Sequence, residues 1–210
     1  SLNTYQNTGV VVFALTNNST FPDADVSAAL PELFPELKEA WINVVNLELV
    51  GEKGSGTETY RLESEKCGAV AKYCLGGDAF RLEVPVHADD GSTKTTQGTS
   101  FMAPQVSAAA SLVAQAFPTQ TPEQWTARLL ASANNDLKKA PSVSGRANGH
   151  SYINHKTADD YSFEICDGCY VEFGNGVRHG YSDGAGHGIL DVYAALQPIT
   201  SHDYKNSLYT

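Results

Sequence analysis

Residues 98–104 (Gly-Thr-Ser-Phe-Met-Ala-Pro) carry the side chain best suited to covalent chemistry. A serine hydroxyl is a weak nucleophile at neutral pH, so it reacts only where its surroundings activate it. Ser100 stands at the start of a helical pattern, where backbone N–H groups lack helical partners and the dipole favours developing negative charge. Gly98 permits a sharp turn, and Pro104 falls in the first helical turn, which tolerates proline. These residues fit a nucleophile, and they also fit a capped, Ala-rich core helix.

Two apolar runs and several helical patterns must position this serine. Residues 9–14 and 41–50 are continuous and β-branched, which indicates strands buried on both faces, as in a parallel sheet. Apolar residues recur at spacings of three and four over 100–117. A second helix is expected after Thr121, which suits the N-cap, with Pro122 at the first helical position and Gln124 at the capping-box position. Residues 188–196 indicate a final helix. Strands followed by helices predict an α/β layered domain.

The segments between these elements are predicted as connections. Residues 29–37 carry two prolines and indicate a loop with a short turn. The polar stretches 51–65 and 87–97 are predicted as loops, and 67–82 as short strands and turns. Residues 134–181 have no clear period and many Gly, Asp, Asn and Tyr residues, which indicates short strands joined by turns.

The composition is that of an ordinary folded domain. The chain has 210 residues, of which 41% are hydrophobic and 18% are charged, and this is enough for one sizeable core. Its net charge of −10 argues against nucleic-acid and anionic-membrane surfaces, because both need clustered Lys and Arg. No apolar run approaches the roughly 18 residues of a membrane span.

The 4 cysteines form two close pairs, Cys67 with Cys74 and Cys166 with Cys169. Short-range pairs are typical of local disulfides in an oxidising compartment. A zinc site would need two Cys-x-x-Cys knuckles, and only the second pair has that spacing. We therefore expect two disulfides, with a metal site as the less favoured alternative.

Residues 98–106 resemble the signature of the subtilisin family around its catalytic serine, Gly-Thr-Ser-x-(small or Met)-x-Pro-x-Val. Residues 12–17 (Val-Phe-Ala-Leu-Thr-Asn) resemble the family's strand that ends in the oxyanion asparagine. The resemblance implies a serine endopeptidase in which Ser100 forms the acyl-enzyme and Asn17 stabilises the oxyanion. Asn18 would be the donor if the register slipped by one residue.

Longer segments resemble the subtilase domains of bacterial autotransporters. These are residues 29–45 and 67–75, and residues 186–196 resemble the family's closing helix motif. The resemblance implies a subtilisin-like parallel sheet flanked by helices, with 1–210 as the C-terminal portion of the peptidase domain and its N-terminal portion missing from this chain. It also implies a disulfide-closed loop at the first cysteine pair and a place in the periplasm, at the cell surface or outside a bacterium. Residues 135–185 are interpreted as a family-atypical insertion.

The family's other catalytic residues have no counterpart in this sequence. Subtilisins need an aspartate and a histidine, which lie in Asp-Ser/Thr-Gly and His-Gly-Thr motifs upstream of the oxyanion strand, and neither motif occurs here. Because Ser1 stands just ahead of the oxyanion strand, we expect the chain to pair with an N-terminal fragment of the same peptidase that carries Asp and His. No catalytic role is assigned to the 6 histidines, which are His87, His150, His155, His179, His187 and His202.

The resemblance also places the substrate pocket, which would take a protein or peptide. Leu15 and Thr16 are expected to form the pocket wall, and Thr16 should narrow the pocket because the family has Gly there. Asp23 and Asp25 lie just beyond and could favour a basic residue, although a solvated acidic loop is the preferred interpretation.

Other functions fit the sequence less well. An α/β-hydrolase esterase would place its serine in Gly-x-Ser-x-Gly, whereas Met102 follows Ser100 at the second Gly position. A non-catalytic binding module or inactive fragment that keeps the scaffold would explain the absent Asp and His motifs. No cofactor is expected, and only structural calcium stays open, because no single loop supplies a full ligand set. The loop aspartates concerned are Asp159, Asp160, Asp167 and Asp183.

Overall fold

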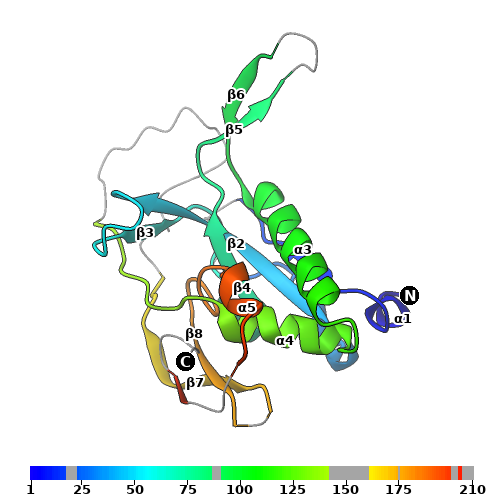
Figure 1. Cartoon of the computed structure of the whole chain (residues 1–210). Coiled ribbons are helices and arrows are strands. Elements are labelled where there is room, and N and C mark those ends of the chain that lie inside the picture. The colour runs from blue at the N-terminus through cyan, green and yellow to red at the C-terminus, as the bar shows by residue number, and fades with distance from the viewer. Residues whose placement is uncertain (18–22, 87–90, 142–160, 175, 200–202, 205–210) are drawn as a thin grey trace.

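The computed structural model describes the chain at residues 1–17, 23–86, 91–141, 161–174, 176–199 and 203–204. These residues form an α/β fold with a central sheet (Figure 1). Helices α3 (Thr99–Ala116) and α4 (Pro122–Ser132) cover one face of that sheet (Figure 1). The α/β layered domain expected from the sequence is confirmed.

The central sheet is built around β2 (Trp41–Val50). β1 (Val11–Ala14) and β4 (Cys74–Asp78) pair with it, and both run parallel to it. Both predicted strands form. β2 is covered on its two faces, as its continuous apolar run predicts, whereas β1 begins at Val11 and is only half-buried. The β2 side chains that are fully buried include Ile42, Val44, Val45 and Leu47.

A further strand, β3 (Thr59–Leu62), pairs antiparallel with the second half of β2. The prediction that residues 51–65 form a loop throughout is therefore wrong over these four positions. The strand is short, and it is fixed by its partner: Arg61 lies opposite Glu48 in the register and forms an ion pair with it. Pairing with a distant strand outweighs the weak local preference here.

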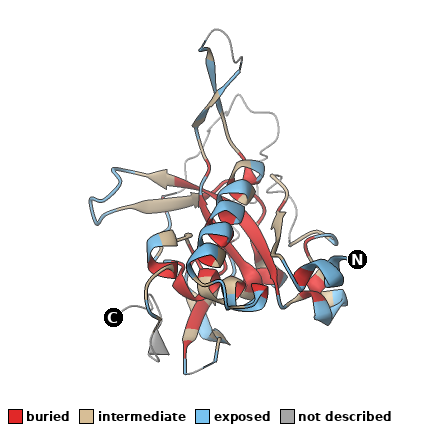
Figure 2. Ribbon diagram, turned by 45° about the vertical axis from the view of Figure 1, so that its right-hand side comes forward, coloured by how far each residue is buried: buried red, intermediate tan, exposed pale blue. Residues whose placement is uncertain are grey.

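The helix α3 lies along the sheet with one buried and one exposed side (Figure 2). It begins one residue earlier and ends one residue earlier than the predicted 100–117. Ala108 is exposed, and Ala103 is half-buried. The α3 residues that are buried are Thr99, Met102, Val106, Ala109, Ala110 and Val113.

The helix α4 begins with the capping box that the sequence predicts. The Thr121 backbone N–H donates to Gln124 Oε1 at 2.9 Å, and the Gln124 backbone N–H donates to Thr121 Oγ1 at 3.3 Å. Each side chain thus satisfies a backbone donor that the helix leaves without a partner.

Several short helices connect these elements. They include α1 (Leu2–Gln6) and η2 (Gly68–Tyr73). The segment predicted as a loop over 29–37 forms the short helices α2 (Leu30–Leu33) and η1 (Pro35–Leu37).

The final helix predicted over 188–196 is reduced to α5 (Val192–Ala195). Its first part is extended instead, because Ile189 bridges both Gly76 and Asn134 and ties this segment to the sheet. Backbone pairing with the sheet thus replaces the first helical turn.

Two hairpins extend from the core. β5 (Leu82–Pro85) and β6 (Thr93–Thr96) form one that projects from the molecule (Figure 1), so the loop predicted over 87–97 is wrong at 93–96. β7 (Ile165–Glu172) and β8 (Arg178–Ser182) form the other, which agrees with the short strands predicted over 134–181. The two-residue β9 (Asp203–Tyr204) pairs in parallel with β8.

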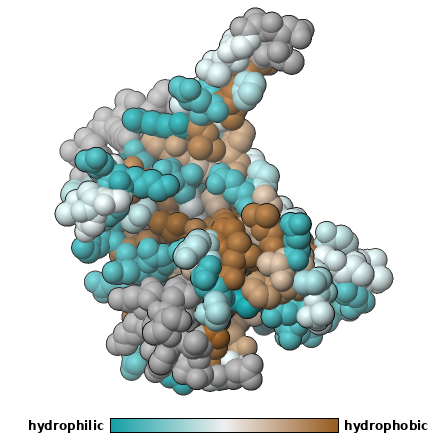
Figure 3. All heavy atoms as spheres, in the orientation of Figure 1, coloured by the Kyte–Doolittle hydropathy of each residue, from teal (hydrophilic) through white to brown (hydrophobic). Residues whose placement is uncertain are grey.

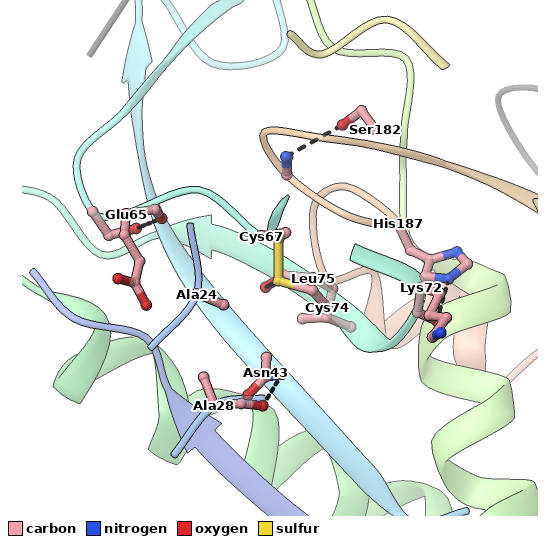
Figure 4. The surroundings of a disulfide bond; sticks show 12 residues. Ala24, Ala28, Asn43, Glu65, Cys67, Lys72, Cys74, Leu75, Ser182 and His187 are labelled. Carbon is pink, nitrogen blue, oxygen red and sulfur yellow. Dashed lines mark hydrogen bonds between the residues drawn. A yellow bond between two sulfur atoms is a disulfide. The ribbon is translucent and has the colours of Figure 1, made fainter. Parts of the chain in front are cut away.

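Both predicted cysteine pairs form disulfides, Cys67–Cys74 and Cys166–Cys169. The first closes the short helix η2 against the start of β4 and lies in the buried core (Figure 4). Across the described ranges, no helix combines the length and apolarity that a bilayer span requires.

A buried histidine pair joins β8 to the segment after it. His179 and His187 are fully buried, and their Nδ1 atoms lie 2.8 Å apart. His187 Nε2 lies 3.0 Å from the backbone oxygen of Lys72, which can only accept, so His187 carries its proton on Nε2. Burial lowers the pKa of His179 to about 4, and burial together with the facing His179 lowers the pKa of His187 well below its usual value.

We predict that both rings stay neutral well below the ordinary histidine pKa of about 6.5. The unfolded chain takes up protons near that pH while the folded chain does not, so stability is complete above it and is lost as the pH falls toward about 4. Ring-nitrogen NMR titration and chemical unfolding across this range measure both effects. A midpoint near 6.5 for either His179 or His187 would contradict the prediction.

We also predict that Thr121→Ala lowers the free energy of unfolding by about 1 kcal/mol, because the Gln124 backbone N–H loses its acceptor. Thr121→Ser keeps the hydroxyl and should stay close to the wild type. Urea unfolding of the two variants side by side makes the comparison, and equal stabilities would show that the cap contributes nothing.

Candidate active site

The start of α3 sits where the carboxyl ends of β1 and β4 meet. The Gly98 backbone N–H donates to the Ala79 oxygen at 3.1 Å, just after β4. The Thr99 hydroxyl donates to the Leu15 oxygen at 2.6 Å, just after β1. Parallel strands of one sheet bring their carboxyl ends to the same edge, and this edge is where such folds build their sites.

Ser100 is exposed at this edge, in the first turn of α3. Backbone N–H groups in a first turn have no acceptor within the helix, and the positive end of the helix dipole lies there. A negative charge that develops beside Ser100 would therefore meet donors and a favourable field. The residue predicted to be the nucleophile is thus exposed and lies at the N-terminus of a long helix.

Asn17 follows β1 and lies against the same helical turn. Its Oδ1 accepts from the Thr99 backbone N–H at 2.9 Å and lies 3.1 Å from the Thr99 hydroxyl, whose single proton has its shorter contact with the Leu15 oxygen. The backbone N–H can only donate, so the contact fixes which end of the amide is oxygen. The Asn17 nitrogen is thereby left as a donor next to Gly98 and Thr99, the two residues before Ser100. Asn18, the alternative donor, lies outside the described residues.

Gly98 leaves the space that this arrangement requires. Its φ of +133° lies in a region that favours glycine, and a Cβ there would come within 3.0 Å of both the nitrogen and the oxygen of the Asn17 amide. Any larger residue would have to move Asn17 or the turn before Ser100.

The residues predicted to line the pocket wall differ in exposure. Leu15 is 1% exposed and packs in the core, so its backbone rather than its side chain faces the site. Thr16 is half-buried, and its backbone is held on both sides by Glu65. Their role in substrate binding stays a prediction.

Glu65 is the residue near this site that the sequence analysis missed. It is 0% exposed, its backbone N–H donates to the Thr16 oxygen at 3.0 Å, and its Oε1 accepts from the Thr16 backbone N–H at 3.3 Å. The pKa of Glu65 is raised to about 7, chiefly by burial and also by the charges of Asp25 and Asp23, while hydrogen bonds from the backbone of Thr16 and of Asp25 oppose the shift. No local sequence pattern marks this glutamate, because its partner lies 49 residues away along the chain.

Asp23 and Asp25 hold the backbone of the segment that contains them. The Asp23 side chain accepts from the Ala69 backbone N–H at 2.8 Å, and the Asp25 side chain accepts from the Ala28 backbone N–H at 2.9 Å. Asp23 is exposed and Asp25 is half-buried. Both side chains therefore accept hydrogen bonds from the backbone. The sequence analysis favoured a solvated acidic loop and did not predict these contacts.

Neither described histidine bonds to Ser100. His179 and His187 bond to each other, and His187 also bonds to Lys72. The other histidines, His87, His150, His155 and His202, lie outside the described residues.

The aspartates considered for calcium are not gathered into one site. Asp183 pairs with Lys66 at 3.0 Å, and Asp167 is exposed within the small Cys166–Cys169 loop. Asp159 and Asp160 fall in a part of the chain that is not described. Within the described ranges, no group of three or more His, Cys, Asp or Glu residues could hold a metal ion.

Comparison with known proteins gives a match to one family model and to a set of solved structures that includes the two below. The model of the Subtilase family matches residues 2–155. The prenylagaramide maturation protease PagA is 17% identical over 90% of this chain and 50% of its own, with a TM-score of 0.48. Fervidolysin from Fervidobacterium pennivorans, a keratinolytic enzyme related to subtilisin, is 18% identical over 90% of this chain and 22% of its own, with a TM-score of 0.50. A search of curated proteins gave no match.

The chain thus spans half the length of the first structure and less than a quarter of the second. At these identities the likeness to fervidolysin supports the fold alone. The family match is stronger, because it covers β1, the sheet and the whole of α3, where Asn17 and Ser100 lie. The fold is subtilisin-like, and the chain belongs to the subtilase family of peptidases.

Proposed function

We propose that this chain is the part of a serine endopeptidase that carries the nucleophile and the oxyanion donor. The observation that carries the proposal is the exposed Ser100 at the start of α3, with the Asn17 amide held against Thr99, the residue before it. Ser100 attacks a peptide carbonyl, a base takes its proton, and the carbonyl oxygen becomes negatively charged. The Asn17 nitrogen and the Ser100 backbone N–H donate to that oxygen. The protonated base then gives its proton to the amine as the C–N bond breaks, and water, deprotonated by the same base, hydrolyses the acyl-enzyme and restores the serine.

The aspartate and the histidine come from an N-terminal fragment of the same peptidase. Two described histidines are committed to each other, and the sequence context of the other histidines does not match the family's motif. Two apolar surfaces could contact such a fragment. β1 is apolar yet only half-buried, and the outer side of α3 exposes Ala108, Leu112 and Ala116. Figure 3 shows apolar side chains gathered along the middle of the face that α3 and α4 cover.

Other parts of the proposal rest on chemistry of the same chain. Two disulfides suit the periplasm, the cell surface or the exterior of a bacterium, as in autotransporter subtilases. Residues 1–210 would be the C-terminal portion of the peptidase domain, with 135–185 as its atypical insertion. Thr16 and the Leu15 backbone would border the substrate pocket. The reaction needs no cofactor, since serine, base and oxyanion donors supply all its steps.

A second candidate function is a binding module that keeps the scaffold without catalysis. The observation in its favour is that neither described histidine bonds to Ser100. The two functions differ in whether a base reaches the serine in the assembled protein.

A fluorophosphonate probe separates them, because it labels a serine only when a base activates it. We expect the peptidase that contains this chain to be labelled at Ser100 and Ser100→Ala to lose the label. Ser107→Ala is the matched control, since Ser107 is an exposed serine on the same helix. Peptide mass spectrometry locates the adduct.

Intact masses of the same sample decide the partner. A second chain that contains the Asp and His motifs, together with labelled Ser100, supports the proposal. Unlabelled Ser100 in a folded sample that contains this chain alone would contradict it and favour the binding module.

A further inference from the structure

A buried carboxyl group reaches the site from outside the segments that carry the catalytic signature. Glu65 follows β3 and approaches Thr16 from a position 49 residues along the chain. It makes two contacts there: its backbone N–H donates to the Thr16 oxygen at 3.0 Å, and its Oε1 accepts from the Thr16 N–H at 3.3 Å. Both polar groups of the Thr16 backbone are therefore held by one residue.

The backbone around Glu65 is itself firmly held. The Ser64 hydroxyl donates to the Glu65 oxygen at 2.9 Å, and Cys67, two residues on, is buried and joined to Cys74. Figure 4 shows the Glu65 carboxyl group pointing toward the segment that contains Ala24, on the side away from the disulfide. The backbone of Glu65 is thus restrained, and its two hydrogen bonds can in turn restrain Thr16.

The contact continues from Thr16 to the nucleophile helix. Asn17 is the next residue, and its side-chain oxygen accepts from the Thr99 backbone N–H at 2.9 Å. A displacement of Thr16 would move the Asn17 amide with it. The amide nitrogen can donate to the oxyanion only if it stays within hydrogen-bond distance of that oxygen. Oxyanion donors act because they are held in place before the charge develops.

We propose that Glu65 is a positioning residue, which holds Thr16 so that the Asn17 amide stays beside Ser100. The inference rests on the proposed function, since it takes Asn17 as the oxyanion donor. A carboxyl group is a costly choice for a merely structural contact, because burial and the nearby charges of Asp25 and Asp23 disfavour its ionised form.

The test compares Glu65→Gln, which keeps an acceptor oxygen, with Glu65→Met, which has similar size and none. In the assembled peptidase we expect Glu65→Met to lower kcat by about 10- to 100-fold with KM little changed, because a small displacement of a donor is costly. Glu65→Gln should restore most of the rate. Lys66→Met is the matched control, since Lys66 pairs with Asp183 at the surface and does not contact Thr16.

Repeating Glu65→Met in an Asn17→Ala variant shows whether the loss of kcat depends on Asn17. Asn17→Ala alone should lower turnover by about 10²–10³-fold, a value measured for such a donor in a subtilisin. If Glu65 acts by positioning Asn17, adding Glu65→Met to Asn17→Ala should lower kcat by less than about threefold further. An equal fold-loss from Glu65→Met with and without Asn17 would overturn the positioning role.

Hydrogen exchange at the Thr99 amide gives a readout that needs no activity. Glu65→Met should speed exchange there about tenfold, Glu65→Gln should not, and the Trp125 amide in α4 should be unchanged in both. Unchanged Thr99 exchange in Glu65→Met would overturn the inference. Failure of the wild type to label at Ser100, with Thr99 exchange responding as stated, would instead overturn the proposed function.

Discussion

The hydrogen bond from the Thr99 backbone N–H to the Asn17 side chain is the contact on which the site depends. It joins residues 82 positions apart, the end of β1 and the start of α3. A parallel sheet makes it feasible, because β1 and β4 end at the same edge and the chain enters α3 from there. Gly98 supplies the backbone conformation and the free space that let the turn close onto Asn17.

Polar groups in the interior hold the loops around this contact. Glu65 fixes the backbone of Thr16. The buried Asn46 side chain accepts from the Ala79 backbone N–H, and the Ala79 carbonyl oxygen accepts from the Gly98 backbone N–H. A buried polar group lowers stability when it has no hydrogen-bond partner. Each of these groups is therefore tolerated because it bonds to the backbone of a loop. The same logic explains the neutral His179–His187 pair, which lies apart from Ser100 and holds β8.

Features that depend on local sequence were predictable, and features that depend on distant partners were not. The strand β2, the helix α3 and the capping box at Thr121 each follow from periodicity or from neighbouring residues. β3 and β6 escaped prediction because their polar sequences become strands only through pairing. In the site, the signature indicated Ser100 and Asn17, whereas Glu65 carries no local mark of its contact with Thr16.

The most direct test of the account is a crystal structure of the assembled peptidase with a peptide boronic acid, which mimics the tetrahedral intermediate. The account predicts a covalent bond from Ser100 Oγ to boron. It also predicts that one boronate oxygen lies within about 2.7–3.1 Å of the Asn17 side-chain nitrogen and the Ser100 backbone nitrogen. An adduct on another residue, or an oxygen that Asn17 does not contact, would contradict the central claim.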